Sequence, residues 1–178
     1  MIELALHILD IVENSIRAGA ALVEINVKED VKNDILSIEI TDNGSGMDRD
    51  TLEKALDPFF TTKTVRKIGL GLSMLKQACE MTDGSFSIDS TPGKGTKVKA
   101  LFLNSHIDRQ PLGDMAGVIT ALILESPDTD IVYTHSKGSE EYILDTRGIR
   151  EGLDGTPLNH PEVINLIRSN ITEGLAEI

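Results

Sequence analysis

One helical segment that is apolar nearly all round constrains the fold of this chain most strongly. Residues 2–18 (IELALHILDIVENSIRA) place aliphatic side chains on almost every side of the predicted helix, and Gly19 is a stop signal. A helix of this composition has to be buried. Residues 22–29 and 35–42 then alternate apolar and polar side chains around a short turn, which predicts a β-hairpin. The first 42 residues therefore predict a helix packed on a sheet.

Helices and paired strands continue to alternate along the chain. Asp48 is a candidate N-cap of the next helix, and Pro58 marks a loop because it cannot join a regular strand ladder. The predicted elements are a helix over 48–56, a loop over 57–63, a helix over 69–84, and strands over 85–90 and 96–103. This order predicts an α/β (α+β) fold, in which helices and a mixed β-sheet form a two-layer sandwich.

The signals weaken after residue 104, where the chain predicts a small C-terminal helix-hairpin-helix extension. Its elements are a helix over 111–125 with Pro111 near its first turn, a hairpin of strands 131–135 and 140–146, and a last helix over 161–175. We expect two parts, a first domain over 1–104 and an accessory or interaction subdomain over 105–178. The hairpin near 131–146 has an exposed strand edge that could pair with another chain, so the sequence leaves open whether the protein forms a homodimer.

Composition and charge exclude several classes of protein. The chain has 178 residues, enough for a core, and a net charge of −12, which disfavours nucleic acid and anionic membranes as partners. Its single cysteine, Cys79, excludes an internal disulfide framework and a cysteine-rich zinc site. No apolar run reaches the ~18 residues of a membrane span, and the N-terminus has no cleavage-like segment. We therefore expect a cytoplasmic protein.

Five polar residues recur at helical spacing within the apolar segment 2–18: Glu3, His7, Asp10, Asn14 and Arg17. Steps of three and four residues put them on one line along the helix. A solvated helix edge, or neighbouring loops that satisfy these groups, is one explanation. The other is a binding site, because an amide oxygen such as that of Asn14 suits Mg²⁺, and a carboxylate such as Asp10 can orient or deprotonate a water molecule.

The stretch ITDNGSGMD (40–48) ends a predicted strand on Asp42. A carboxylate in that place can accept a hydrogen bond from an amino group at the floor of a pocket. Gly44 and Gly46 allow a flat ligand to approach the backbone. Because D-N-G is also a common surface turn, this stretch alone leaves both interpretations open.

Three further stretches point to phosphate or polar chemistry, each with an ordinary alternative. GLGLS (69–73) opens a helix, whose free N–H groups favour an anion, although glycines also permit close helix packing. FFTTK (59–63) supplies two hydroxyls and Lys63, which suits either a terminal phosphate or an exposed loop. Thr96 in GKGT (93–96) is a ligand candidate or an ordinary strand residue. Neither a P-loop nor a dinucleotide fingerprint occurs.

Taken in order, Asn14, DNGSGM, FFTTK, GLGLS and GKGT resemble the motifs of the Bergerat-fold, or GHKL, ATPases. These include the ATP-binding domains of DNA gyrase, heat-shock chaperones, mismatch-repair MutL and histidine kinases. The resemblance covers about residues 3–103. ENSIRAGA, VEINV and IEITDNGSGM are similar to MutL, whereas DPFFTTK and GLGLS are similar to the histidine-kinase and anti-sigma serine-kinase branch. IDRQPLGDMAGVITALI (107–123) resembles stand-alone ATP-binding proteins encoded beside iron hydrogenase subunits of anaerobic bacteria.

The resemblance implies a Mg-ATP site with assigned roles. Asn14 would coordinate Mg²⁺, Asp42 would accept the adenine amino group, and Thr96 would assist near adenine. Asp10 is the candidate base and Lys63 the candidate phosphate contact. The other nucleotide contacts implied are Gly44, Gly46, Met47, Phe60, Thr61, Thr62, Gly69, Leu70, Gly71 and Leu72.

The chain also departs from the family pattern. Members that hydrolyse ATP or phosphorylate serine carry Glu four residues before the asparagine, where this chain has the shorter Asp10. The phospho-accepting helix of histidine kinases and the DNA-binding and transducer domains of gyrase or MutL are not found in the sequence. We expect a small regulatory protein kinase or nucleotide switch that binds ATP or ADP and an unidentified protein partner. The alternatives are a catalytically weak, nucleotide-dependent binding module and a simple ATPase.

Overall fold

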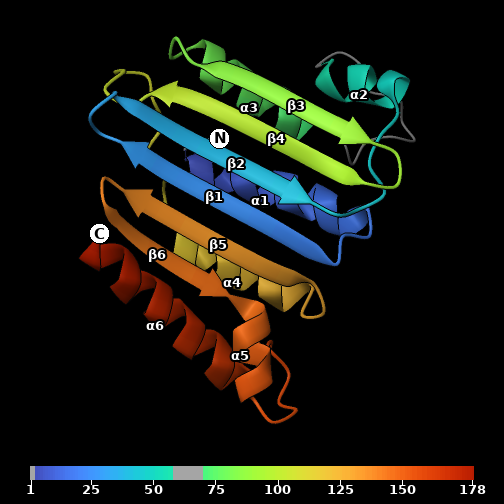
Figure 1. Cartoon of the computed structure of the whole chain (residues 1–178), viewed down its shortest axis with the longest axis vertical. Helices are drawn as coiled ribbons and strands as arrows, with labels where there is room; N and C mark the ends of the chain where they lie inside the picture. The colour runs from blue at the N-terminus through green and yellow to red at the C-terminus, as the bar shows by residue number, and fades with distance from the viewer. Residues whose placement is uncertain (1–2, 58–69) are drawn as a thin grey trace.

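A single mixed β-sheet organises the part of the chain that the structure describes. The structure is a computed structural model, and it describes residues 3–57 and 70–178. In spatial order the six strands are β3 (Ser85–Thr91), β4 (Gly95–Leu103), β2 (Ile35–Asp42), β1 (Leu22–Asp30), β5 (Asp130–Lys137) and β6 (Glu140–Asp145). All neighbours run antiparallel except β1 and β5, which are parallel. Figure 1 shows this order across the sheet.

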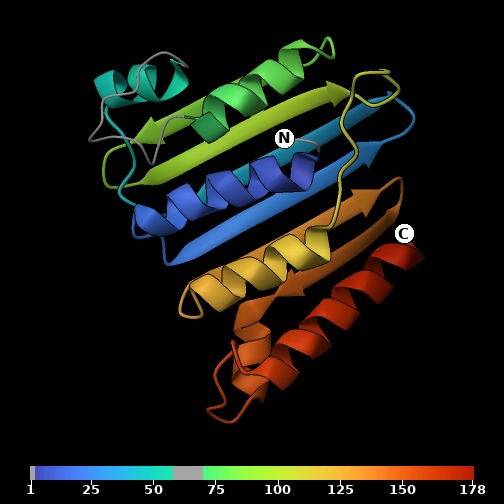
Figure 2. The same cartoon turned by 180° about the vertical axis from the view of Figure 1, so that it is seen from behind.

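Helices cover one face of this sheet, and the other face is open. Behind the sheet in Figure 1, and in front of it in Figure 2, lie α1 (Leu4–Arg17), α3 (Leu70–Glu80), α4 (Met115–Glu125) and α6 (Pro161–Glu177). Two short helices, α2 (Arg49–Leu56) and α5 (Thr146–Gly152), lie at the margins. The mixed sheet under a helix layer confirms the predicted α/β two-layer sandwich.

The core forms where the apolar helix meets the apolar side of each strand. On α1, Leu4, Ile8 and Val12 are fully buried, as expected for a helix that is apolar nearly all round. The inward strand positions follow the predicted alternation, so that Ile25 and Ile38 pack under the helices while their neighbours face outward. The hairpin of β1 and β2 is confirmed within one residue at its boundaries.

The segment before α4 differs from the prediction. The sequence predicts a helix from residue 111, but α4 begins at Met115 with the Asp114 side chain as its N-cap. The Pro111 and Leu112 carbonyls instead accept hydrogen bonds from the backbone N–H groups of Leu4 and Ala5, at 2.9 and 2.7 Å. These donors have no partner inside α1, because the first turn of any helix leaves its N–H groups unsatisfied. The prediction of Pro111 inside the helix is therefore wrong, since this segment caps α1.

The C-terminal elements extend the same sheet. β5 pairs in parallel with β1, and β6 pairs with β5, so the predicted hairpin lies beside the first β-hairpin in one continuous sheet. α5 follows β6 directly, with the Asp145 side chain accepting a hydrogen bond from the Arg147 N–H, and was not predicted. The division into a domain over 1–104 and a subdomain over 105–178 stays a prediction. None of the described helices combines the length and apolarity that crossing a membrane requires.

His7, one of the five polar residues on α1, is buried against the segment that precedes α4. Its Nε2 lies 3.0 Å from Oε1 of Gln110, while Nδ1 is buried without a hydrogen-bond partner among the described residues. Burial disfavours the charged imidazolium and so lowers the pKa of His7 below its usual 6.5. This polar group holds the capping segment against α1.

We expect His7 to make the free energy of unfolding depend on pH. Because the folded-state pKa is lowered, the unfolded chain binds a proton that the folded chain does not, and stability falls as pH drops through 6.5. His7→Gln keeps a partner for Gln110 but cannot titrate. Urea unfolding should be measured at pH 7.5, 6.5 and 5.5. As the pH falls, the variant should lose less free energy of unfolding than the native protein, by up to about 1.4 kcal/mol per pH unit. Equal slopes for both proteins would contradict the assignment.

Candidate functional site

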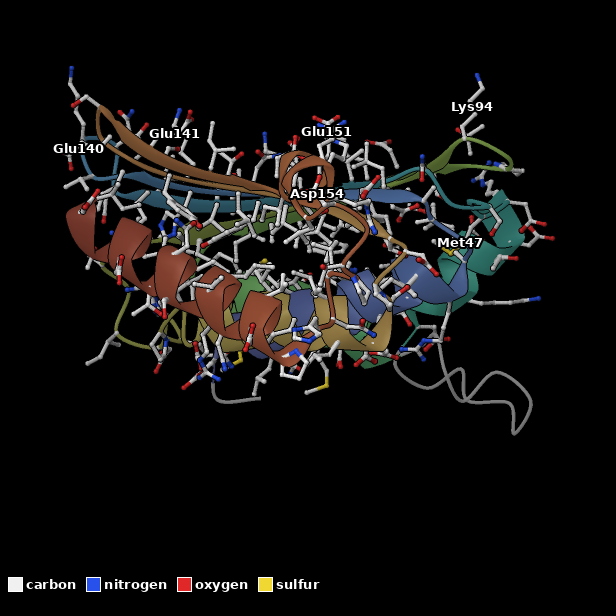
Figure 3. The ribbon with its side chains drawn as sticks, turned by 90° about the horizontal axis from the view of Figure 1, so that it is seen from below. Met47, Lys94, Glu140, Glu141, Glu151 and Asp154 are labelled. Atoms are coloured by element: carbon white, nitrogen blue, oxygen red, sulfur yellow. The ribbon has the colours of Figure 1, made fainter. Side chains whose placement is uncertain are left out.

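A cavity of about 270 Å³ opens between α1, the adjoining ends of β2 and β4, and the loop that follows β2. Figure 3 shows Met47, from that loop, at the end of the molecule opposite the start of β6. Six predicted site residues line this cavity together: Asn14, Asp42, Gly46, Met47, Leu72 and Thr96. They come from four separate segments of the chain, which the fold brings to one place.

Asp42 lies at the floor of the cavity because of its position on β2. Strand alternation turns Leu36, Ile38 and Ile40 toward the helices, and Asp42 continues that series. Asp42 as a whole is only 9% exposed to solvent. A carboxylate so placed needs hydrogen-bond donors, because burying an unpaired charge is costly.

Three internal donors hold the Asp42 carboxylate. Oδ1 accepts from the N–H of Gly44 at 2.9 Å and from the N–H of Thr96 at 3.3 Å, while Oδ2 accepts from the hydroxyl of Ser15 at 2.6 Å. An ionised carboxylate offers about four acceptor sites, two on each oxygen. One site therefore remains on Oδ2, and the residue lines the cavity. The group is fixed in place and still able to accept one hydrogen bond from a ligand.

Thr96 belongs to a second polar chain beside Asp42. The antiparallel register of β2 and β4 sets Asp42 opposite Thr96. The Thr96 hydroxyl lies 2.8 Å from the hydroxyl of Ser90, which in turn accepts from the N–H of Met47 at 2.8 Å. Strand β4, strand β3 and the loop after β2 are thus joined at the cavity wall. Sequence reasoning missed Ser15 and Ser90, whose partners Asp42 and Met47 are distant in sequence.

The glycines of this region are required by protein contacts. Gly46 has a φ of +64°, and a Cβ there would collide with the carbonyl oxygen of Thr91. A Cβ at Gly44 would lie 3.1 Å from the Cβ of Ala18. Both glycines let the loop after β2 pack against its neighbours, and Gly46 also lines the cavity. That these two glycines shape the wall of a ligand site stays a prediction.

Asp10 and Gly71 lie against each other at the start of α3. A Cβ at Gly71 would be 3.0 Å from the Cβ of Asp10, so glycine allows the first turn of α3 to approach α1 closely. This contact agrees with the packing alternative for the glycines of GLGLS. It also sets the Asp10 carboxylate beside the N-terminal end of α3, whose free N–H groups favour negative charge.

The metal-ligating atoms at the cavity suit a magnesium ion that is bound mainly by water and phosphate oxygens. Asn14, whose side chain carries an amide oxygen, lines the cavity, and no group of three or more His, Cys, Asp or Glu side chains forms a metal cluster within residues 3–57 and 70–178. Mg²⁺ keeps several waters and takes phosphate oxygens, so one protein ligand suffices where a phosphate ligand is present. The residues therefore fit Mg²⁺ bound together with a nucleotide.

Several predicted contacts fall outside the residues that the structure describes: Phe60, Thr61, Thr62, Lys63 and Gly69. Leu70 is the first residue of α3, although the placement of its side chain is not described. The predicted loop over 57–63 lies in the same part of the chain, apart from Asp57. Their proposed roles rest on the sequence.

Comparisons with known proteins agree with this geometry. A sequence model of the "Histidine kinase-, DNA gyrase B-, and HSP90-like ATPase" family matches residues 2–106. Sensor kinase CckA of Brucella abortus is 37% identical over 110 residues, which cover 53% of this chain and 12% of that protein. The autoinducer 2 sensor kinase/phosphatase LuxQ of Vibrio harveyi is 34% identical over 171 residues, which cover 86% of this chain and 19% of that protein.

A solved structure supports the fold independently. The N-terminal domain of a DNA repair protein superposes with a TM-score of 0.56 at 20% identity, covering 82% of this chain and 53% of that one. The chain spans less than a fifth of the length of the two kinases. The family match covers more than half of the chain and includes every described residue at the cavity. The chain therefore belongs to the histidine kinase-, DNA gyrase B- and HSP90-like ATPase family, the GHKL superfamily expected from its motifs.

Proposed function

We propose that this protein binds Mg-ATP in the cavity beside Asp42. The observation that carries the proposal is the buried carboxylate itself, which is held by three internal donors and keeps one acceptor site on Oδ2. The exocyclic amino group of adenine is a donor that matches this site. The apolar walls formed by Ile11, Ile40 and Val98 suit the faces of a flat base.

The phosphate end of the nucleotide extends toward Asn14 and the start of α3. Asn14 holds Mg²⁺ through its amide oxygen, and Mg²⁺ when bound neutralises phosphate charge. The backbone N–H groups at the start of α3 bind phosphate oxygens. Residues 60–63, with Lys63 as the phosphate contact, complete the site. We place this activity in the cytoplasm, where ATP is available.

The proposed activity is that of a small regulatory protein kinase or nucleotide switch, with Asp10 as base. One observation favours a second candidate, a binding module whose affinity for a partner protein depends on the bound nucleotide. Asp10 has a shorter side chain than Glu, and it packs against Gly71 and not among the described residues that line the cavity. A base held about 1 Å too far from its target slows a reaction greatly. A simple ATPase is the third candidate.

Incubation with γ-labelled ATP and Mg²⁺, with and without candidate protein partners, separates these activities. Label on a partner supports the kinase. Release of phosphate alone supports the ATPase. Tight binding with neither product supports the binding module, and failure to bind ATP at all overturns the proposal.

Asp10→Glu should raise turnover if the reach of the carboxylate limits the rate. The added methylene moves the carboxylate away from α1 by about 1 Å, a shift that changes rates by up to about 100-fold. Asp10→Asn is the matched control, because it keeps the size of the side chain and removes the base. Steady-state phosphate release should rank Asp10→Glu above the native protein and Asp10→Asn below it. A fall in turnover on Asp10→Glu would assign Asp10 another role.

A further inference from the structure

Strand β6 leaves one edge of the sheet without a partner strand. It pairs with β5 through residues 140–145 and is the last strand in the described sheet order. The outer edge of such a strand presents backbone N–H and C=O groups that another extended chain can pair with. This edge lies far from the nucleotide cavity, since Met47 and Glu140 mark opposite ends of the molecule in Figure 3.

The side chains on the open face of β6 alternate acidic, apolar, acidic. Tyr142 and Leu144 turn toward the helices, where a Cβ added at Gly174 of α6 would collide with the Tyr142 ring. Glu141, Ile143 and Asp145 therefore point to the open face. Ile143 is 57% exposed. A partner strand could cover it.

Four exposed carboxylates without a salt bridge to any described residue lie at the start of this strand or beyond its end: Glu140, Glu141, Glu151 and Asp154. Figure 3 shows the first two at one end of β6 and the other two beyond its other end. Two nearby cations already form salt bridges with other carboxylates: Arg147 with Asp145 at 2.7 Å and Arg150 with Asp130 at 3.0 Å. Lys137 stands opposite Glu140 in the hairpin. Residues 105–178 as a whole carry −8 of the net charge of −12.

These charges select against a second copy of the chain. In a symmetric antiparallel pair of two β6 strands centred on Ile143, Glu141 of each copy would face the like-charged Asp145 of the other on the open face. Like charges directly opposite each other destabilise a strand pair. The same carboxylates repel nucleic acid and anionic lipid. They attract a basic segment of protein.

We propose that the β6 edge binds an extended, basic segment of a partner protein as a seventh strand. The complementary pattern on the open face is basic, apolar, basic, with the apolar side chain over Ile143 and the basic ones near Glu141 and Asp145, toward Glu151 and Asp154. Backbone pairing supplies affinity, and the alternating side chains supply specificity. This surface gives residues 105–178 a docking role that is independent of nucleotide binding.

Three labelled peptides test the proposal with the full chain at low ionic strength. The peptide TKTVTKT carries the complementary pattern, TKPVPKT keeps its charge but loses two backbone N–H donors, and TETVTET reverses its charge. We expect TKTVTKT to bind at least about tenfold more tightly than either control, a difference of about 1.4 kcal/mol. It should also slow amide hydrogen exchange within residues 140–145. Equal binding of TKPVPKT, or unchanged exchange in β6, would overturn strand addition.

A matched pair of variants separates local recognition from attraction to an acidic protein. Glu141 and Asp89 are both exposed on the open face of edge strands, β6 and β3 respectively. Glu141→Lys should weaken TKTVTKT binding at least about fivefold, whereas Asp89→Lys makes the same change in charge and should leave it within about twofold. An equal loss in both variants would overturn the docking site. Protection of residues 140–145 that grows with protein concentration in the absence of peptide would assign the edge to self-association instead.

Discussion

Replacing Asp42 by Asn should nearly abolish ATP binding while leaving the protein folded. The two side chains have the same shape, and an Asn oxygen in the place of Oδ1 can still accept from the N–H groups of Gly44 and Thr96. The amide nitrogen then replaces Oδ2. It presents a donor to the cavity, where the adenine amino group is also a donor.

The expected loss follows from the charge and from the mismatch of donors. A hydrogen bond to a charged group contributes about 1.5–3 kcal/mol, and two opposed donors add to that loss. We therefore expect the dissociation constant for ATP to rise about 100-fold or more in isothermal titration calorimetry. Ser15→Ala is the matched control, because it removes one donor to Oδ2 but keeps the acceptor that would bind adenine. Its effect should stay below about tenfold. ATP affinity within threefold of the native value for Asp42→Asn would end the adenine assignment.

Gly46→Ala should strongly destabilise the fold beside the cavity. At φ +64° an added Cβ would collide with the Thr91 carbonyl oxygen and would lie 3.1 Å from the Gly95 carbonyl oxygen. Neither neighbour is a flexible side-chain end, so the turn between β3 and β4 would have to move. We expect a loss of about 3 kcal/mol or more in the free energy of unfolding, from steric conflict and backbone strain together.

Gly93→Ala provides the matched comparison, in the β3–β4 turn that Gly46 packs against. Gly93 has a similar φ of +76°, but an added Cβ meets nothing within 4 Å. Only the backbone cost remains, about 1 kcal/mol. Urea unfolding of both variants should therefore show a difference of about 2 kcal/mol. Equal losses would mean that the loop after β2 does not pack against the β3–β4 turn as described.

Local signals made the first hairpin and the α2 cap predictable from sequence. The alternation in β1 and β2 fixes both faces of the hairpin, and the Asp48 side chain caps α2 by accepting from the Thr51 N–H, as predicted. Such features depend on residues within a few positions of one another. The parallel pairing of β1 with β5 joins segments about 100 residues apart, and no local pattern specifies it.

The site shows the same division between local and distant contacts. Motif order predicted that Asn14, Asp42 and Thr96 would meet, and they line one cavity. The spacing of polar residues on α1 also suggested a single functional line, but His7 serves the capping segment near Gln110. Its partner is 103 positions away, so sequence spacing alone could not separate it from Asn14. The Ser15 bond to Asp42 was missed for the same reason.

A crystal structure with Mg²⁺ and a non-hydrolysable ATP analogue tests the central assignment most directly. We expect the adenine amino nitrogen within about 3 Å of Oδ2 of Asp42, and the magnesium ion bound to the Asn14 amide oxygen. A nucleotide bound elsewhere, or a base whose amino group points away from that carboxylate, would contradict the account.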